Sequence, residues 1–392
     1  MNLREPIALL GGLSPTLFMR DYWQKRPLLI RGALPLVAGD GAPLAPLTPA
    51  ELFALAARDD VESRLVIRDE RAAARPRPPQ AGAAALWRLR HGPFSRRSLP
   101  ALGRRGWTLL VQGVDLHVQS AHDLLQRFRW IADARVDDLM VSYASPGGGV
   151  GPHVDSYDVF LLQVRGHRRW RTGPVEAPSF VDGLPVRLLE NFAPTDEFLL
   201  APGDMLYVPP RWGHDGVAED ECMTCSIGYR APTGLALARE LLQRVLDDVE
   251  PEHDESHFRD PPRSATETPA KVPGALDAFA RKAVERLLRD PAQLARALGE
   301  VMTEPKPHVW FDAGRERGPG AGLRLDRRTR MMYDERRVFI NGESFDAAGR
   351  DARLMRDLAD ARRLAASQCG RLSTGARAVV ADWVAQGWAH DD

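Results

Sequence analysis

Two histidines and one aspartate are the residues of this chain best suited to metal chemistry. His153-Val154-Asp155 is followed, far downstream, by His214. Two imidazoles and one carboxylate are the ligands of a non-haem Fe(II) facial triad, which leaves other coordination positions open for a co-substrate and O2. Residues i and i+2 of a β-strand point to the same side, so His153 and Asp155 can reach one ion, with His214 supplied by another strand. The alternative is that these are three unrelated polar side chains of a β protein, because one His-x-Asp is common by chance.

The surrounding segments favour a metal site at the mouth of a β-barrel. A glycine-rich turn at residues 147–151 precedes His153, and an apolar segment follows. This turn lacks the Lys-Ser/Thr pair and the following helix of a phosphate-binding loop. Residues 201–210 read Ala-Pro-Gly-Asp-Met-Leu-Tyr-Val-Pro-Pro, a tight turn and strand typical of cupins, and His214 comes soon after. We therefore predict that His153, Asp155 and His214 bind one metal ion.

The centre of the chain must supply the strands that position these ligands. Short apolar segments alternate there with glycine- and proline-containing turns, which predicts antiparallel sheets rolled into a barrel. We expect strands over residues 138–144, 153–164, 168–172, 187–189, 197–200, 204–208 and 223–229. Upstream we expect helices over 16–24 and 121–131 and a helix N-capped by Thr48. We also expect strands over 27–31 and 107–118 and a loop over 75–85.

The sequence changes character after Pro232. Residues 235–249 have the periodicity of a helix with a broad apolar face. Residues 251–273 are rich in proline and polar side chains and are predicted to be an exposed linker. Further on we expect helices over 275–289 and 291–302, strands over 322–325 and 337–340, and helices over 350–365 and 374–386. This order predicts three domains: a catalytic domain (1–232), a helical segment (233–304) and a winged-helix-like domain (305–392).

The composition is that of an ordinary globular protein. Among 392 residues, 53 basic side chains balance 53 acidic ones, so the net charge is zero and gives no general attraction to nucleic acid. The predominance of arginine over lysine is attributed to coding bias, and we expect no direct readout of nucleic acid. No signal peptide or membrane-spanning segment is predicted, and three cysteines do not make a disulfide framework, so we expect a cytoplasmic protein.

Two further pairs of candidate metal ligands are given structural interpretations. Cys222 and Cys225 have the spacing of half a zinc knuckle, but no second pair follows and they fall in a predicted strand, where i and i+3 face opposite sides. We expect buried strand cysteines. His253 and His257 lie in the predicted linker and are expected to be solvated.

Several motifs together resemble one family, the bacterial JmjC-type ribosomal oxygenases of the cupin superfamily. The motifs are Trp23–Pro27, His91–Phe94, Asp137–Met140, Pro146–His153, Tyr157–Phe160, Arg168–Arg171 and Gly228–Pro232. The resemblance implies an α+β fold with a double-stranded β-helix, a helical dimerisation segment and a winged-helix-like domain. It also implies Fe(II) as the cofactor and 2-oxoglutarate and O2 as co-substrates. The expected reaction is hydroxylation of an arginine Cβ in a large-subunit ribosomal protein, and the expected assembly is a homodimer.

The same resemblance assigns residues to the co-substrate. Arg168 stands where the family carries the arginine that binds the C5 carboxylate of 2-oxoglutarate, a role that suits the planar guanidinium. Arg169 is the alternative if the strand register is shifted by one residue. Ser142 and Thr224 fall where the family lines the co-substrate pocket with small polar side chains. Tyr157 is expected to point into the cavity, either as a buried structural residue or as a contact to the substrate.

Other functions remain open at the level of sequence. A histidine of a ribosomal protein is an alternative target for the same chemistry. A non-catalytic ribosome-binding cupin module is an alternative of a different class, although an intact triad and Arg168 speak against it. Another cupin enzyme, such as an isomerase or a ring-cleaving dioxygenase, would usually have more histidine ligands and no arginine matched to the chelating co-substrate.

Overall fold

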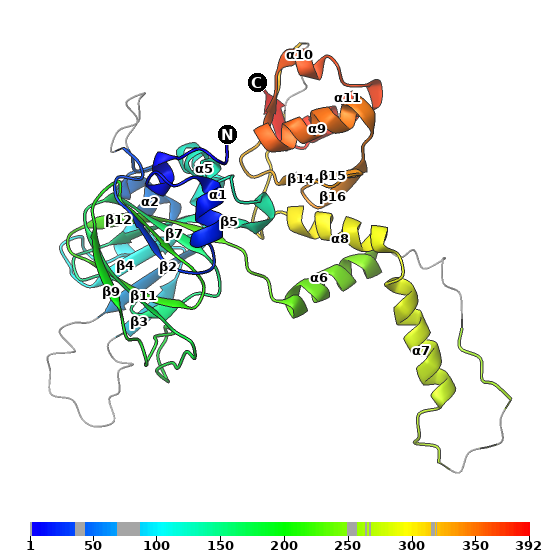
Figure 1. Ribbon diagram of the computed structural model, residues 1–392, viewed down its shortest axis with the longest axis horizontal. Coiled ribbons are helices and arrows are strands. Elements are labelled where there is room, and N and C mark those ends of the chain that lie inside the picture. The colour runs from blue at the N-terminus through cyan, green and yellow to red at the C-terminus, as the bar shows by residue number, and fades with distance from the viewer. Residues whose placement is uncertain are drawn as a thin grey trace. The chain divides into compact units, whose positions relative to one another are not determined.

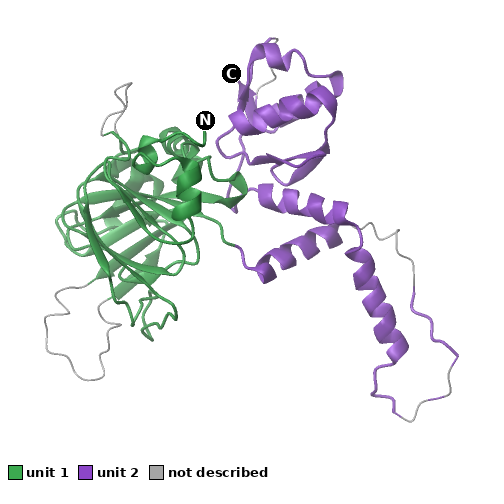
Figure 2. Cartoon of the chain, viewed as in Figure 1, with its two compact units in different colours: residues 1–231 green, residues 232–392 purple. Residues whose placement is uncertain are grey.

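The computed structural model describes residues 2–35, 44–68, 87–248, 257–262, 265, 268–314, 318 and 320–392. The chain forms two compact units, residues 1–231 and 232–392 (Figure 2). The boundary lies at Pro232, where the composition changes. The predicted loop over 75–85, His253 and much of the predicted linker lie outside the described residues. The further division of the second unit at residue 304 stays a prediction.

Two antiparallel sheets form the first unit (Figure 1). The larger has the strand order β1-β10-β7-β12-β5-β4-β2-β3, and the smaller has the order β6-β11-β8-β9. The strands are β1 Leu28–Ile30, β2 Ser63–Arg68, β3 Trp87–His91, β4 Trp107–Val111, β5 Val136–Ala144, β6 His153–Val154, β7 Val159–Arg165, β8 Arg168–Pro174, β9 Asp196–Leu200, β10 Met205–Val208, β11 Trp212–Ala218 and β12 Cys222–Tyr229. The predicted α+β class with a double-stranded β-helix is confirmed.

Three predicted strands differ from the observed ones. The segment over 153–164 is two strands, because residues 155–158 bend between β6 and β7. The segment over 107–118 ends as a strand at Val111 and continues as the short helix α4 (Val114–His117) after Gly113, whose φ is 58°. Residues 187–189 contain no strand, and Leu189 makes only an isolated bridge to Phe180.

Helices pack beside the barrel and are capped as their sequences indicate. Ser14 accepts a hydrogen bond at the start of α1 (Pro15–Asp21), and Thr48 forms a capping box with Glu51 at the start of α2 (Pro49–Leu55). Helix α5 spans Gln119–Gln126, so the predicted helix over 121–131 is shifted toward the N-terminus. These elements enclose a core whose largest fully buried side chains include Phe18, Trp107, Tyr143, Phe160 and Tyr207.

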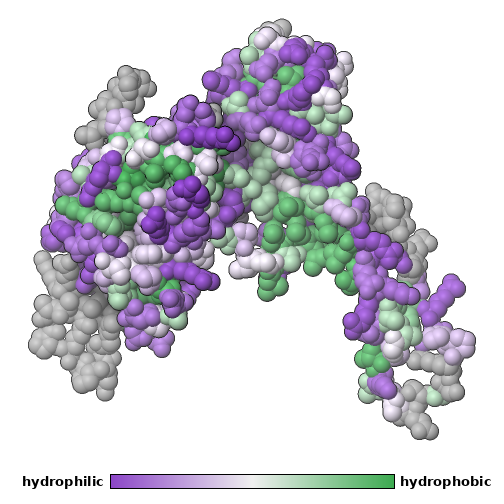
Figure 3. Space-filling model, viewed as in Figure 1, coloured by the Kyte–Doolittle hydropathy of each residue, from purple (hydrophilic) through white to green (hydrophobic). Residues whose placement is uncertain are grey.

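Three helices begin the second unit: α6 Gly234–Asp247, α7 Gly274–Leu287 and α8 Pro291–Thr303. Helices α6 and α8 lie side by side (Figure 1) and are joined by ion pairs of Arg244 with Glu304 (3.1 Å) and of Arg296 with Asp248. All three predicted helices are confirmed. Apolar side chains gather on the surface over α6 (Figure 3), where Leu235 is 73% exposed.

The winged-helix part follows with its own core. Its elements are β13 Leu323–Leu325, β14 Met331–Tyr333, β15 Arg337–Ile340, β16 Glu343–Asp346, α9 Gly349–Ala361, β17 Arg363–Leu364, α10 Ala366–Cys369, α11 Thr374–Ala385 and β18 Ala389–Asp391. The strands form two three-stranded sheets, in the orders β17-β13-β18 and β14-β15-β16. The predicted strands over 322–325 and 337–340 and both predicted helices are confirmed, whereas β14, β16, β17 and β18 were not predicted.

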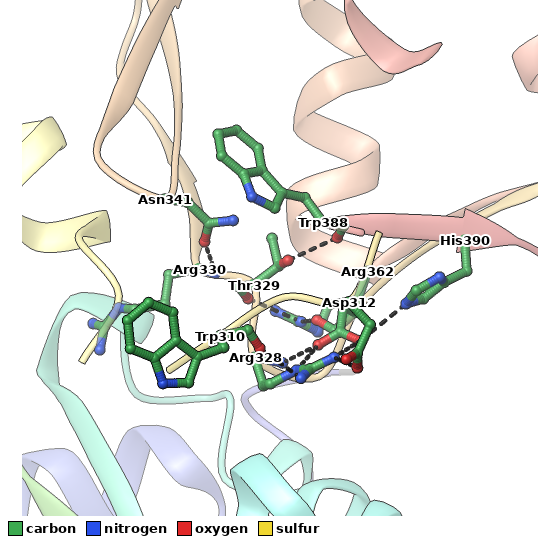
Figure 4. Close-up of polar contacts among 10 residues, drawn as sticks. Trp310, Asp312, Arg328, Thr329, Arg330, Asn341, Arg362, Trp388 and His390 are labelled. Carbon is green, nitrogen blue, oxygen red and sulfur yellow. Dashed lines mark hydrogen bonds and ion pairs between the residues drawn. The ribbon is translucent and has the colours of Figure 1, made fainter. Parts of the chain in front are cut away.

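A buried aspartate, Asp326, joins distant parts of this winged-helix fold. Its partners Arg328, Arg362 and His390 lie close together in Figure 4. Asp326 accepts hydrogen bonds from Arg328 Nε at 2.8 Å and from His390 Nε2 at 2.9 Å. Arg328 also donates to the carbonyl of Trp310 (2.6 Å), and Arg362 donates to the carbonyl of Asp326 (2.6 Å). The cluster therefore joins the segment before β13, the β13–β14 turn, the end of α9 and the C-terminal strand. Within the described residues, none of the helices is long and apolar enough to cross a membrane.

Candidate metal and co-substrate site

The three predicted metal ligands come together at one end of the smaller sheet. His153 of β6 and His214 of β11 are directly opposite each other across the strand pair, and their ring centroids are 4.1 Å apart. Asp155 Oδ2 lies 3.6 Å from His214 Nε2 and 4.0 Å from His153 Nε2. The ligand atoms of all three residues lie within 4.8 Å of one another, and no other such group of three or more His, Cys, Asp or Glu side chains occurs among the described residues.

The route by which Asp155 reaches this site differs from the prediction. Strand β6 ends at Val154, so Asp155 is not on the same strand face as His153 but in the bend that follows. The bend ends at Asp158, which is fully buried and accepts hydrogen bonds from Tyr207 Oη at 2.6 Å and from Gln24 Nε2 at 3.2 Å. These long-range contacts fix the bend, and the bend carries Asp155 to the two histidines.

Each histidine contacts a backbone carbonyl through Nδ1. His153 Nδ1 lies 2.9 Å from Gly151 O, and His214 Nδ1 lies 3.3 Å from Trp212 O. These contacts favour the tautomer with the proton on Nδ1, which leaves Nε2 with its lone pair for a metal. Burial, reinforced by the nearby His153, lowers the pKa of His214 to about 4, so this imidazole is neutral at physiological pH. Neutral imidazoles and a carboxylate fit Fe(II).

Arg168 lies inside the barrel, where the co-substrate is expected. It is 4% exposed, and its Nη1 donates to Ser142 Oγ at 3.1 Å and to Thr224 Oγ1 at 3.3 Å. Its Nε is buried and has no hydrogen-bond partner among the described residues. A buried guanidinium with an unused donor fits a carboxylate such as C5 of 2-oxoglutarate. Arg169, the alternative, points out of the barrel and pairs with Glu219 and Glu197.

A cavity of about 910 Å³ joins the metal ligands to Arg168. Its lining includes His153, Asp155, His214, Arg168, Ser142 and Tyr157, and also Asp137, Asp138 and Trp170 from the family motifs. Arg64, Gln112 and Gly216 line it as well, and the sequence did not single them out. Tyr157 is 39% exposed, so it lies at the rim and not in the core. Thr224 does not line the cavity, contrary to the prediction, but accepts a hydrogen bond from the cavity-lining Arg168.

Trp170 connects the two ends of the site. Its ring centroid lies 5.8 Å from that of His214 and 5.2 Å from the guanidinium carbon of Arg168. This position agrees with alternation along β8, which predicts Arg168 and Trp170 on one face of the strand and Arg169 and Arg171 on the other. Cys222 and Cys225 are buried in β12, as predicted, and burial raises the pKa of the Cys225 thiol.

Comparisons with known proteins agree with this arrangement. Residues 123–237 match the JmjC domain family, and residues 286–390 match the ROXA-like winged helix. The chain is 34% identical to the ribosomal protein uL16 3-hydroxylase of Escherichia coli K12 over 86% of both chains. It is 37% identical to a probable ribosomal oxygenase of Haemophilus influenzae over 56% of this chain and 50% of that one.

Solved structures of the E. coli ribosomal oxygenase YcfD have the same fold. One superposes with a TM-score of 0.80 at 29% identity and covers 96% of this chain and 98% of that chain. Another, in complex with cobalt and 2-oxoglutarate, superposes with a TM-score of 0.75 at 29% identity over 97% and 98% of the two chains. The chain therefore belongs to the JmjC-domain ribosomal oxygenases and is a dioxygenase that depends on Fe(II) and 2-oxoglutarate.

Proposed function

We propose that this protein hydroxylates Cβ of an arginine in the large-subunit ribosomal protein uL16. The similarity to the E. coli uL16 3-hydroxylase extends over 86% of both chains and so includes the catalytic and winged-helix regions. The observation that carries the proposal is the cavity in which the His153, Asp155 and His214 triad faces the buried Arg168. The resemblance to peptidyl-arginine hydroxylases supplies the target residue.

Acidic side chains near the metal ligands support a cationic target. Asp137 and Asp138 line the cavity together with Tyr157. Burial and the neighbouring carboxylates of Asp155 and Asp138 raise the pKa of Tyr157. Asp138 accepts a hydrogen bond from Gly113 N at 2.8 Å, which holds its carboxylate in place. A guanidinium entering this rim would meet carboxylates that match its planar donors.

The residues of the chain divide the work between binding and shielding. His153, Asp155 and His214 would hold Fe(II), which together with 2-oxoglutarate and O2 supplies the oxidising power that inserts oxygen into a C–H bond. Arg168, oriented by Ser142 and Thr224, would bind the C5 carboxylate of 2-oxoglutarate. The apolar cavity wall, which includes Val159, Leu161 and Trp170, would limit the access of water to the reacting carbon.

The direct test is oxidation of purified uL16 in the presence of Fe(II), 2-oxoglutarate and ascorbate, read by mass spectrometry. We expect a gain of one oxygen atom on an arginine-containing peptide with wild-type protein and none with His153→Ala. His308→Ala is the matched control, because His308 is exposed and belongs to the second compact unit, so its loss should leave the product unchanged. Oxygen on a histidine would contradict the arginine assignment, and no turnover by the iron-loaded protein would favour a non-catalytic binding module.

We also propose that the protein is a homodimer formed through α6–α8 and that it acts in the cytoplasm. Three apolar side chains of these helices are largely exposed: Leu235 (73%), Leu246 (50%) and Val284 (55%). This is an unusual concentration of apolar surface for a monomer. A second copy of the chain would cover them. Light scattering should give twice the chain mass for the wild type and a monomer for Leu246→Arg, with Glu240→Arg on the same helix remaining dimeric. A monomeric wild type would contradict the proposal.

A further inference from the structure

Gln163 is a fully buried amide on β7 with every polar atom engaged. Its Oε1 accepts a hydrogen bond from Thr224 Oγ1 at 2.9 Å. Its Nε2 donates to Arg165 O at 2.8 Å and to Gly166 O at 3.1 Å. A buried amide is costly unless it is hydrogen-bonded, so this side chain has one well-defined arrangement.

Both sets of contacts act on Arg168. The single hydroxyl proton of Thr224 is donated to Gln163, so the Thr224 oxygen presents only lone pairs to Arg168 Nη1, 3.3 Å away. The carbonyls that Gln163 binds belong to the turn that leads directly into β8 and Arg168. The turn is also held from the other side, because His167 N donates to Asp220 Oδ1 at 2.6 Å, and the close approach of Gly166 to Glu221 O leaves no room for a Cβ.

We propose that Gln163 is a positioning residue for the co-substrate. It fixes the backbone before Arg168 through the turn, and it fixes the guanidinium through Thr224. The buried Nε of Arg168, which has no partner among the described residues, is thereby held in place to bind a carboxylate. Gln163 itself does not line the cavity and would not touch the co-substrate. The inference rests on the proposed role of Arg168.

The test compares two ligands of the Mn(II)-loaded protein by calorimetry without O2. N-oxalylglycine chelates the metal and carries the distal carboxylate, whereas oxalate chelates the metal without one. We expect Gln163→Leu to weaken N-oxalylglycine about 3- to 10-fold, the range of one hydrogen bond, and to leave oxalate unchanged. Gln163→Glu keeps the acceptor for Thr224 but loses both donors, so it should also weaken N-oxalylglycine and leave oxalate unchanged. This variant replaces Gln163→Leu if the leucine variant does not fold.

The variant Arg168→Met tests the carboxylate-binding role of Arg168 separately from the positioning role of Gln163. If Arg168→Met binds N-oxalylglycine like the wild type, the proposed role of Arg168 is wrong. If Arg168→Met loses affinity and both Gln163 variants keep it, only the positioning role of Gln163 is wrong. An equal loss of both ligands in the Gln163 variants would mean a general structural role and would also contradict the inference.

A second, independent observation concerns Arg64 on the opposite wall. Arg64 of β2 lines the cavity, and its Nε is buried without a hydrogen-bond partner among the described residues. Strand register places Arg64 opposite Leu110 of β4, and Leu110 opposite Ser142 of β5. At about 4.8 Å per strand, the backbone of Arg64 is therefore roughly 10 Å along the sheet from the backbone of Ser142, which contacts Arg168. Gln112 lines the same wall.

We propose that Arg64 and Gln112 bind the main chain of the protein substrate beside its target residue. A polypeptide that enters the cavity loses water from its carbonyl and N–H groups, and these need replacement partners. The guanidinium of Arg64 supplies donors for a carbonyl, and the amide of Gln112 supplies both a donor and an acceptor. This inference also rests on the proposed oxidation of uL16.

Arg64→Met should raise the KM for uL16 about tenfold and leave the binding of N-oxalylglycine unchanged. Arg88→Met is the matched control, since Arg88 is exposed on the neighbouring strand β3, and alternation with the cavity-lining Leu89 puts it on the opposite face. Arg64→Lys keeps the charge and should recover part of the loss. An unchanged KM, or a weakened N-oxalylglycine complex instead, would contradict the assignment; failure of the wild type to oxidise uL16 would contradict the proposed function itself.

Discussion

At the scale of single residues, the site depends on close packing between Trp170 and the backbone of β11. A Cβ at Gly216 would lie 2.6 Å from the Trp170 ring, and the same ring lies beside both His214 and Arg168. Glycine is required here because of this close approach and not because of an unusual φ. The missing side chain at Gly216 thus leaves room for the Trp170 ring, which packs beside both the metal ligand His214 and the co-substrate residue Arg168.

Gly216→Ala should therefore damage both stability and co-substrate binding. Displacing Trp170 from a packed position is expected to lower the free energy of unfolding by about 1–3 kcal/mol, and the affinity for 2-oxoglutarate should fall with it. Thermal unfolding and calorimetric titration measure the two effects. Gly103→Ala, at a position where a Cβ meets nothing within 4 Å, is the control. Wild-type behaviour of Gly216→Ala in both measurements would show that the Trp170 ring is free to move.

Parts of the site that depend on local sequence could be predicted, whereas parts that depend on contacts between residues far apart in the sequence could not. Residue types and spacing were enough to select His153, Asp155 and His214. The family resemblance favoured Arg168, and the alternative Arg169 stayed open until the structure placed it in ion pairs with Glu197 and Glu219. The bend that carries Asp155 could not be predicted, because it is fixed by the contact of Asp158 with Tyr207, distant in sequence. Arg64 was missed for a similar reason: only the pairing of β2 with β4 brings it to the cavity.

At the scale of elements, the winged-helix fold is held by short strands and by the Asp326 cluster. Strands of two to four residues, such as β17 and β16, carry too little periodicity to be recognised, and their pairing is decided by contacts across the unit. The longer helices α9 and α11 were predicted because each presents a regular apolar face. Asp326 connects segments that lie outside these helices, through its hydrogen bonds with Arg328, Arg362 and His390.

Asp326→Asn should destabilise this unit in a pH-dependent way. Although burial opposes ionisation, hydrogen bonds from Arg328 and His390 outweigh it and hold the pKa of Asp326 below its usual range. A lowered folded pKa stabilises the protein above the unfolded value of about 3.9, and this contribution is lost as the pH falls below it. We expect a loss of about 1.5–3 kcal/mol at pH 7 that shrinks below pH ~4.

Urea unfolding followed by thiol labelling of the buried Cys369, located by mass spectrometry, measures this difference in the second unit. Asp357→Asn on α9 is a suitable control, because Asp357 is exposed and has only a weak contact with Gln368 at 3.5 Å. A difference between Asp326→Asn and wild type that stays constant from pH 7 to pH 3 would contradict the linkage.

At the scale of the whole molecule, the chain contains two compact units with separate cores, residues 1–231 and 232–392. The metal ligands, Arg168 and the cavity all belong to the first unit. Ligands that bind the native site should therefore stabilise one unit and leave the other unaffected. The boundary at Pro232 was visible in the sequence as a change from strand patterns to helical periodicity.

Calorimetry of the full chain should show this independence. Mn(II) with N-oxalylglycine at 100 times its Kd should stabilise the first unit by about 2.7 kcal/mol and raise its transition temperature. The transition of the winged-helix unit should not move, and His153→Ala should abolish the shift. Equal shifts of both transitions would mean that the two units unfold as one.

Hydroxylation of an arginine in uL16 is tested by locating the added oxygen in the product. Wild-type protein and His153→Ala would be incubated with uL16, Fe(II) and 2-oxoglutarate, and the product analysed by fragmentation mass spectrometry and by comparison with authentic 3-hydroxyarginine. We expect one oxygen on Cβ of a single arginine, formed by the wild type and not by the variant. Oxygen on another residue, or wild-type turnover of 2-oxoglutarate with uL16 left unmodified, would contradict it.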